Sequence, residues 1–320
     1  MLMNKNKMVI GQGAAAMDIV IQCRHLPGED SFGRIYQERI TSGGSGANVL
    51  VTIAQLGAAA ALVAKLGEDQ FGRQFRRELL ADGVSDQYLH VKPGGATMHT
   101  YVFVTEQGKR SILVNRGNSF HTLNPEEVDE SILDNASVFY SDGCPGGVAV
   151  KLAKAAKARN IPVFIQMECL PSFMLSEYCT AEQIDELLSY ADIICAGRDV
   201  YCELAAKADY LFSIQDTYEK YKPAFGVICT AGEEGAIWHS RHGAISCGVY
   251  AINPVDTTGA GDSFCGGLIY RFFLQGAGRK DTLTFATACA AMKCLSPGPR
   301  LRVSEAAVTN FMNKHSMTNL

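Results

Sequence analysis

The sequence predicts an α/β protein with a mostly parallel sheet that helices cover on both faces. Three observations lead to this prediction. Short apolar segments rich in Val and Ile alternate with amphipathic segments, their connections are short, and 47% of the 320 residues are hydrophobic. Strands buried on both faces are typical of parallel sheets, whose crossover helices cover them. No linker or low-complexity segment divides the chain, so we expect a single domain over residues 1–320.

The expected elements follow one another in a regular order. Buried strands are predicted at residues 8–10, 60–67, 137–143, 162–167, 192–197 and 225–232. Helices are predicted at 47–57, 71–83, 124–135, 148–160 and 181–191. Gly57 and Gly83 stand where helices are expected to end. Two segments, about 18–41 and 97–116, have the β-branched alternation and central turn of antiparallel hairpins, which predict a small accessory sheet.

Composition excludes several classes of partner. The formal net charge is −4 and no run of 18 apolar residues occurs, so we expect neither a nucleic-acid-binding nor a membrane protein. The eleven cysteines are scattered without a CxxC pair, which favours free thiols in the reducing cytoplasm. The apolar N-terminal stretch that ends at Cys23 could pass for a signal peptide. Gln12 and Asp18 interrupt it, which argues against that interpretation.

The segment "NPVDTTGAGDSFCGGLIYRFF" (253–273) carries the clearest chemistry. Gly259, Ala260 and Gly261 precede apolar residues at helical spacing, so their backbone N–H groups are expected at the open, positive end of a helix. Asp262 beside them can accept a proton. A carboxylate next to an anion-binding turn suits phosphoryl transfer to a hydroxyl group. The alternative is that Asp262 only starts the helix and that the glycines allow tight packing.

Two further glycine clusters add to this pattern. "TSGGSGANV" (41–49) places Gly43 and Gly44 before Asn48, whose amide can both donate to and accept from a sugar hydroxyl. "CTAGEEGAIW" (229–238) predicts a strand, a tight turn and a second strand. Taken singly, each cluster is also explained by a helix cap or a turn.

Together and in this order, the clusters resemble the ribokinase/PfkB family of carbohydrate kinases. "DTTGAGDSF" and "GGSGANV" resemble its two signature regions, "CTAGEEGA" resembles its nucleotide-side turn, and the resemblance covers almost the whole chain. It implies a ribokinase-like three-layer α/β/α sandwich with a small β-sheet lid made from the two hairpins. It also implies a small-sugar acceptor, with ATP and Mg²⁺ as cofactors, and it allows a monovalent cation such as K⁺.

The resemblance assigns roles to residues at matching positions. Asp262 would be the catalytic base, and the backbone of Gly259, Ala260 and Gly261 would form the anion hole. Residues implied in substrate binding are Asp18, Gly43, Gly44 and Asn48, and those implied in nucleotide binding are Thr230, Gly232 and Gly235.

The sequence departs from the family pattern at one place. Many members carry an Asn-x-x-Glu motif that organises magnesium, and Gly197 and Val200 stand at its positions here. No metal ligand is therefore assigned, and Glu168 is a candidate for contact with the metal through water. Short matches such as "VFIQME" and "AAMKC" are similar to the ketohexokinase branch. That likeness implies that Asp30 reaches the sugar of a partner subunit and that Arg110 lies near the transferred phosphate. The exposed hydrophobic faces expected on the lid hairpins predict a homodimer that buries them.

The substrate can be narrowed by charge. A sugar phosphate would need extra cations at the pocket. The positions where related phosphosugar kinases carry Lys and Arg hold Ser45 and either Val51 or Leu50. We therefore expect a neutral sugar. A charged sugar remains an alternative, because the expected lid carries Arg34, Arg39 and Arg110.

Three other functions compete with this interpretation. A nucleoside kinase shares the fold, and a non-catalytic sugar- or nucleotide-binding regulator would fit the altered Asn-x-x-Glu region. "GQGAAA" (11–16), with Asp30 about 20 residues on, also matches a dinucleotide-binding fingerprint. That fingerprint requires a helix directly after its glycines, whereas a β-branched strand is predicted there.

Overall fold

The computed structural model describes residues 8–107 and 110–318, and within them the main sheet has nine strands. Their order is β13-β12-β11-β10-β9-β8-β1-β4-β5, parallel from β11 to β5 and antiparallel at β12 and β13. The strands are β1 (Met8–Gln12), β4 (Ala60–Gly67), β5 (Leu89–Lys92), β8 (Ala136–Ser141), β9 (Val163–Met167), β10 (Ile193–Gly197), β11 (Gly226–Thr230), β12 (Ala236–Ser240) and β13 (Gly243–Cys247). The predicted fold class, α/β with a mostly parallel sheet, is confirmed.

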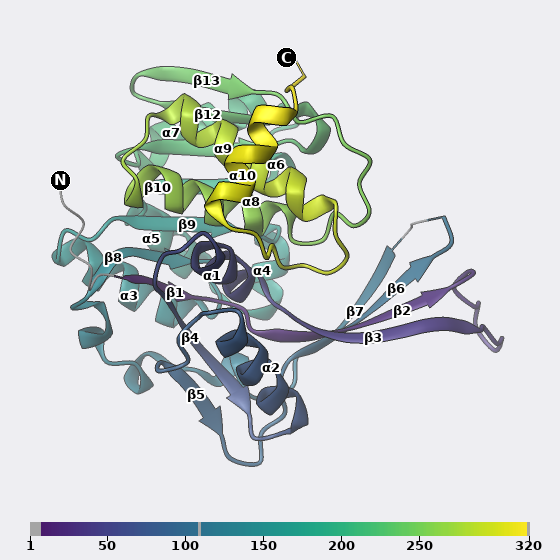
Figure 1. The fold of residues 1–320 in the computed structure, drawn as a ribbon. Helices are drawn as coiled ribbons and strands as arrows, with labels where there is room; N and C mark the ends of the chain where they lie inside the picture. The colour runs from purple at the N-terminus through teal and green to yellow at the C-terminus, as the bar shows by residue number, and fades with distance from the viewer. Residues whose placement is uncertain (1–7, 108–109, 319–320) are drawn as a thin grey trace.

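Helices cover both faces of this sheet (Figure 1). One hydrophobic cluster joins the sheet to α1 (Ser45–Gln55), α2 (Gln70–Ala81), α8 (Ala260–Ile269), α9 (Arg279–Cys294) and α10 (Glu305–Lys314). A second cluster joins the opposite face to α3 (Gly146–Ala158), α4 (Pro171–Glu177), α5 (Ala181–Ser189), α6 (Arg198–Ala205) and α7 (Tyr210–Tyr221). The two clusters make a three-layer α/β/α sandwich. No helix in the described ranges has both the length and the apolar character that crossing a membrane requires.

A separate four-stranded sheet forms the lid, which extends from the body as an arm (Figure 1). It consists of β2 (Ala16–Cys23), β3 (Ile35–Gly43), β6 (His99–Thr105) and β7 (Arg110–Asn115), in the order β3-β2-β6-β7. β2 pairs antiparallel with β3, β6 pairs antiparallel with β7, and β2 and β6 join the two hairpins in parallel. At the base of the lid, β2 and β6 therefore begin and β3 and β7 end, and β2 begins shortly after the carboxyl end of β1.

The structure differs from the sequence-based prediction at residues 124–135, which form no α-helix. They fold into short 3₁₀ turns at Pro125–Glu127 and Glu130–Leu133. The Asp129 side chain accepts a hydrogen bond from the Ser131 N–H, so it begins a new turn and stops the first from continuing. Elsewhere Gly57 and Gly83, with φ of 102° and 89°, end α1 and α2 as predicted.

Candidate active site

The turn that opens α8 contains one internal hydrogen bond, from the Ala260 N–H to the Thr257 carbonyl oxygen at 3.2 Å. Gly259 caps the helix with a left-handed φ of 76°, and a Cβ at this position would collide with the carbonyl oxygen of Pro299. Gly259 thus lies just outside the helix rather than in its first turn. A Cβ built on Gly261 would meet no atom within 4 Å, so this side of the first turn faces open space. The turn has the geometry of an anion-binding helix N-terminus.

The Asp262 carboxyl group is buried beside this turn, with 4% of the residue exposed. Its Oδ2 accepts a hydrogen bond from Asn48 Nδ2 at 2.8 Å, and its Oδ1 accepts one from Gln166 Nε2 at 3.0 Å. This contact joins the glycine motif that contains Asn48 to the one that contains Asp262, although the two residues are 214 positions apart in sequence. Asn48 Oδ1 is buried and has no hydrogen-bond partner among the described residues, so it remains able to accept one from a substrate hydroxyl.

The surroundings of Asp262 act on its pKa in opposite directions. Burial raises the pKa above its ordinary value, and the hydrogen bonds from Asn48, Gln166 and Ser45 lower it. The net direction is upward, which makes the carboxylate a better proton acceptor.

Gln166 is a site residue that the sequence did not single out. Its Oε1 accepts a hydrogen bond from the buried Tyr140 hydroxyl at 2.9 Å, which turns the amide nitrogen toward Asp262. The only sequence signal is a polar residue near the end of a predicted buried strand, and strand ends are where sites form in parallel sheets.

Asp18 lies on β2 at the base of the lid. Its Oδ1 accepts a hydrogen bond from Thr100 Oγ1 of β6 at 2.6 Å, and burial raises its pKa. A Cβ on Gly43 would collide with the Asp18 carboxylate, so the glycine makes room for the acid. Gly44, with φ of 88°, caps α1 and sends the chain on toward Asn48.

A second buried carboxylate that the sequence did not reveal is Asp142, directly after β8. It accepts hydrogen bonds from the backbone N–H groups of Ala14, Gly46 and Cys144 at 2.6, 3.1 and 3.1 Å. Burial raises its pKa to about 7. Asp142 ties the start of the lid to the first turn of α1 and so helps to position Asn48.

Glu168 follows β9 and opens onto a cleft. Its Oε2 accepts a hydrogen bond from Gln166 Nε2 at 2.8 Å. The surrounding protein and the nearby Asp262 raise its pKa, but solvent reaches the side chain and weakens this effect. No cluster of three or more metal-binding side chains occurs in the described residues, so Glu168 is not part of a preformed metal cage.

Three cavities surround the α8 turn. One of about 350 Å³, here called the acceptor cavity, lies under the lid and is lined by Asp18, Arg39, Asp256 and Thr257. A second of about 430 Å³ lies on the other side and is lined by Thr230, Gly232, Gly235, Thr257 and Gly261. A third of about 540 Å³ continues from it along Glu168, Gly197 and Gly261. We call the second and third the nucleotide-side cavities.

None of the three cavities is lined by Asp262, Asn48, Gly43, Gly44 or Gly259, which lie in or behind their walls. The remaining predicted site residues lie farther away or outside the described structure. Asp30 lies in the exposed turn between β2 and β3, with φ of 56°, at the far end of the lid. Arg110 begins β7 and pairs through its backbone with Val104, but its side chain is outside the described residues.

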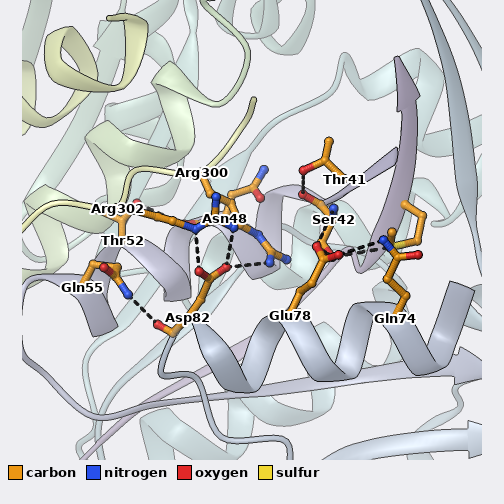
Figure 2. A network of polar contacts seen from close by, with 11 residues as sticks. Thr41, Ser42, Asn48, Thr52, Gln55, Gln74, Glu78, Asp82, Arg300 and Arg302 are labelled. Atoms are coloured by element: carbon orange, nitrogen blue, oxygen red, sulfur yellow. Dashed lines mark hydrogen bonds and ion pairs between the residues drawn. The ribbon is translucent and has the colours of Figure 1, made fainter. Parts of the chain in front are cut away.

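A polar network on α2 holds two segments of the site in place (Figure 2). Glu78 accepts hydrogen bonds from the Ser42 hydroxyl at 2.6 Å and from its backbone N–H at 3.2 Å. Asp82 pairs with the buried Arg300 at 2.9 Å and with Arg302 at 2.6 Å. The network thereby fixes the end of β3 beside Gly43 and the segment whose Pro299 carbonyl meets Gly259.

Comparison with known proteins agrees with this geometry. The family model described as pfkB family carbohydrate kinase matches residues 6–306. The chain is 28% identical over 309 residues to an ATP-dependent ribose-1-phosphate kinase of Halopiger xanaduensis, covering 96% of this chain and 98% of the relative. It is 28% identical over 287 residues to fructokinase-2 of Solanum lycopersicum, covering 83% and 86%.

The fold agrees as well. The structure of Arabidopsis thaliana ribokinase complexed with ribose and ATP superposes with a TM-score of 0.81 at 22% identity, covering 96% of this chain and 98% of that one. The ribokinase-like architecture predicted from the sequence is therefore confirmed. The narrower likeness to the ketohexokinase branch stays a prediction. The chain belongs to the pfkB family of carbohydrate kinases, and the protein is an ATP-dependent carbohydrate kinase.

Proposed function

We propose that this kinase transfers the γ-phosphoryl group of ATP to a hydroxyl of a small neutral sugar, with Asp262 as the general base. One observation carries the proposal: the α8 turn lies between the acceptor cavity and the nucleotide-side cavities. Thr257 lines a cavity on each side, and Gly261 lines both nucleotide-side cavities. An acceptor on one side and a triphosphate on the other would face each other across the turn.

The proposed reaction follows from this arrangement. The Asp262 carboxylate takes the proton of the acceptor hydroxyl, whose oxygen forms a bond to the γ-phosphorus as the bond to the β-phosphate oxygen breaks and ADP leaves. The backbone N–H groups at Gly259 and Gly261 stabilise the negative charge on the transferred group, and that of Ala260 joins them once it leaves the Thr257 carbonyl oxygen. Asn48 and Gln166 hold the carboxylate in place. The lid over the acceptor cavity excludes water, which would otherwise compete as an acceptor.

Magnesium would be held mainly by the nucleotide itself. Glu168 lines the third cavity together with Asp199, Glu233 and Glu234, and it would contact the ion through water. Bound Mg²⁺ would neutralise phosphate charge. Gly197 and Val200 at the Asn-x-x-Glu positions leave this part of the cleft without further ligands from that motif.

Charge in the acceptor cavity supports a neutral substrate. Its charged lining residues are two acids, Asp18 and Asp256, and one base, Arg39. Arg39 Nη2 already pairs with Asp256 Oδ2 at 3.3 Å. A phosphate group would therefore meet a net negative lining, because the single guanidinium is shared with a carboxylate. The relative that acts on ribose-1-phosphate makes that sugar the strongest competitor.

A coupled assay of ADP release tests the proposal. The acceptors should include fructose, ribose, tagatose, glucose, ribose-1-phosphate and nucleosides. We expect turnover with one or more neutral sugars. Turnover with nucleosides alone would favour the nucleoside-kinase alternative. A preference for ribose-1-phosphate would contradict the argument from the charge of the acceptor cavity. No turnover with any acceptor would favour a non-catalytic regulator.

We predict that replacing Asp18 with alanine raises KM for the sugar by about 10- to 100-fold, the equivalent of one lost charge-assisted hydrogen bond. The KM for ATP should change little, because Asp18 lies in the acceptor cavity and lines neither nucleotide-side cavity. Steady-state kinetics with each substrate varied in turn measures both constants. Equal changes in the two would place Asp18 outside the sugar site.

We also propose that a second copy of this chain covers the outer face of the lid. Ile40, Ile19, Tyr101 and Leu113 pair across all four lid strands in one row. Because side chains alternate along a strand, this row lies on the face opposite Asp18. Ile40, Tyr101 and Leu113 are 43%, 37% and 62% exposed. Exposed apolar surface of this kind marks an interface.

Sedimentation velocity at micromolar concentration should therefore show a dimer. Replacing Leu113 with glutamate should shift it toward monomer, because a charge would be buried in the apolar contact. Replacing the exposed Leu80 of α2 with glutamate serves as the control and should have no effect. A wild-type monomer would contradict the proposal.

A further inference from the structure

Lys293, on α9, is completely buried, with 0% of the residue exposed. Its ammonium group donates to the main-chain carbonyl oxygens of Asp256 at 2.7 Å and Ser296 at 3.2 Å. Lysine is almost never fully buried unless it is paired, because removing an ammonium ion from water costs several kcal/mol. The mechanism described above gives this charge no role, so its position calls for a reason.

The two carbonyl groups belong to the segments that enclose the α8 turn. Asp256 stands three residues before Gly259, and its carboxylate accepts hydrogen bonds from the N–H groups of Thr258 and Gly298, each at 2.9 Å. Ser296 begins the stretch that leads to Pro299, whose carbonyl oxygen lies against Gly259. The Lys293 ammonium therefore joins both walls of the turn that would bind the transferred phosphoryl group. It reaches them from α9, which packs along α8 (Figure 1).

The Lys293 charge also acts on the nearby Asp256 carboxylate. A positive charge held by main-chain carbonyl oxygens is an arrangement by which proteins bind a monovalent cation. We infer that the Lys293 ammonium acts as a built-in monovalent cation, which holds the turn at residues 256–259 in its catalytic shape. The K⁺ ion that the sequence resemblance allows does not fit beside it, because the Asp256 and Ser296 carbonyl groups already bind Lys293. Lys293 is thus a positioning residue, and its role rests on the function proposed for the turn.

This inference predicts how the protein responds to salt. Wild-type kcat should be the same when K⁺ is replaced by Na⁺ or by an organic cation at constant ionic strength. Replacing Lys293 with alanine should lower kcat by about 10²-fold, the loss expected for a small displacement of reacting groups. The same change leaves the carbonyl oxygens facing an empty space, so added K⁺ or NH₄⁺ should restore much of the activity.

A thermal readout separates this inference from the function proposed above. K⁺ should raise the Tm of the Lys293→Ala variant and leave that of the wild type unchanged, whichever acceptor the enzyme uses. Lys280→Ala is the matched control: Lys280 is on the same helix and donates to the Ser246 carbonyl at 2.7 Å, but it is exposed and its partner belongs to β13 rather than to the turn. The control should gain no response to K⁺.

Several results would overturn the inference. These are activation of the wild type by K⁺, full activity of Lys293→Ala without alkali cations, or lost activity in folded Lys293→Ala that neither K⁺ nor NH₄⁺ restores. Lys293→Met, which keeps the volume of the side chain, is the second variant. It should fold and lose activity, and it should not be rescued, because the methionine fills the space that the cation needs. Failure of every acceptor in the ADP-release assay would count against the proposed function alone.

Discussion

Replacing Asp262 with asparagine is expected to lower kcat by about 10²–10⁴-fold, the usual contribution of a general base. The asparagine side chain has nearly the same shape but cannot take the acceptor's proton at neutral pH. Affinity for ATP should remain, because Asp262 lines neither nucleotide-side cavity. Pre-steady-state phosphoryl transfer and calorimetric titration with ATP measure the two quantities. Unchanged kcat in this variant would remove Asp262 from its proposed role.

The same variant should remain folded. Asp262 accepts from the amide groups of Asn48 and Gln166, and an asparagine there would place one NH₂ group against another. Asn48 can relieve this by turning its amide, because its Oδ1 has no partner among the described residues. The variant also removes a buried charge, whose cost in the wild type grows as pH rises above the unfolded-state pKa near 3.8. The Tm at neutral pH should therefore be equal to or above that of the wild type.

The raised pKa of Asp262 also determines the pH dependence of the wild type. The carboxyl group must be ionised to act as a base, so kcat/KM should fall as pH drops through its folded-state pKa. This acidic limb should lie above 3.8, because burial raises the pKa. The residual kcat/KM of the Asp262→Asn variant should not show this decrease at low pH.

The sequence predicts the framework well because the framework depends on local patterns. Apolar runs indicated the central strands, and glycines indicated the ends of α1 and α2. The prediction was wrong at residues 124–135, where amphipathic spacing suggested one helix. There the Asp129 side chain competes for a backbone N–H group, and this local preference overrides the periodicity.

The site was only partly predictable, for a physical reason. Asp262 and Asn48 stand in glycine motifs, and the structure brings them into contact. Gln166 and Asp142 can be recognised as site residues only when β1, β8 and β9 are known to lie side by side. The order of the strands is a property of the whole sheet and not of a local pattern. The role of Lys293 is harder still to predict, because a lysine in a helix is ordinarily interpreted as a surface residue. Its burial depends on where α9 packs against the turn at residue 256.

Two alanine substitutions two residues apart are expected to change stability in opposite directions. Gly259→Ala should destabilise the fold by about 2–6 kcal/mol, combining the cost of a left-handed φ with that of overpacking. Both terms apply because φ is 76° and the added Cβ would collide with the Pro299 carbonyl oxygen. Gly261→Ala should stabilise by about 0.5–1 kcal/mol, because alanine is the better helix residue and its Cβ meets no atom within 4 Å. Chemical denaturation measures both changes.

Activity should nevertheless fall in both variants. At position 259 the whole turn must move away from Pro299, which misdirects its amides. At position 261 the backbone stays in place, but the new methyl group enters the nucleotide-side cavities. The loss of kcat should be about 10²–10³-fold where an anion-hole contact is lost. Gly261→Ala is the sharper test, because a variant that is more stable and less active cannot owe its defect to misfolding. If it is fully active, phosphate does not pass beside the first turn of α8, and that turn is not the anion hole.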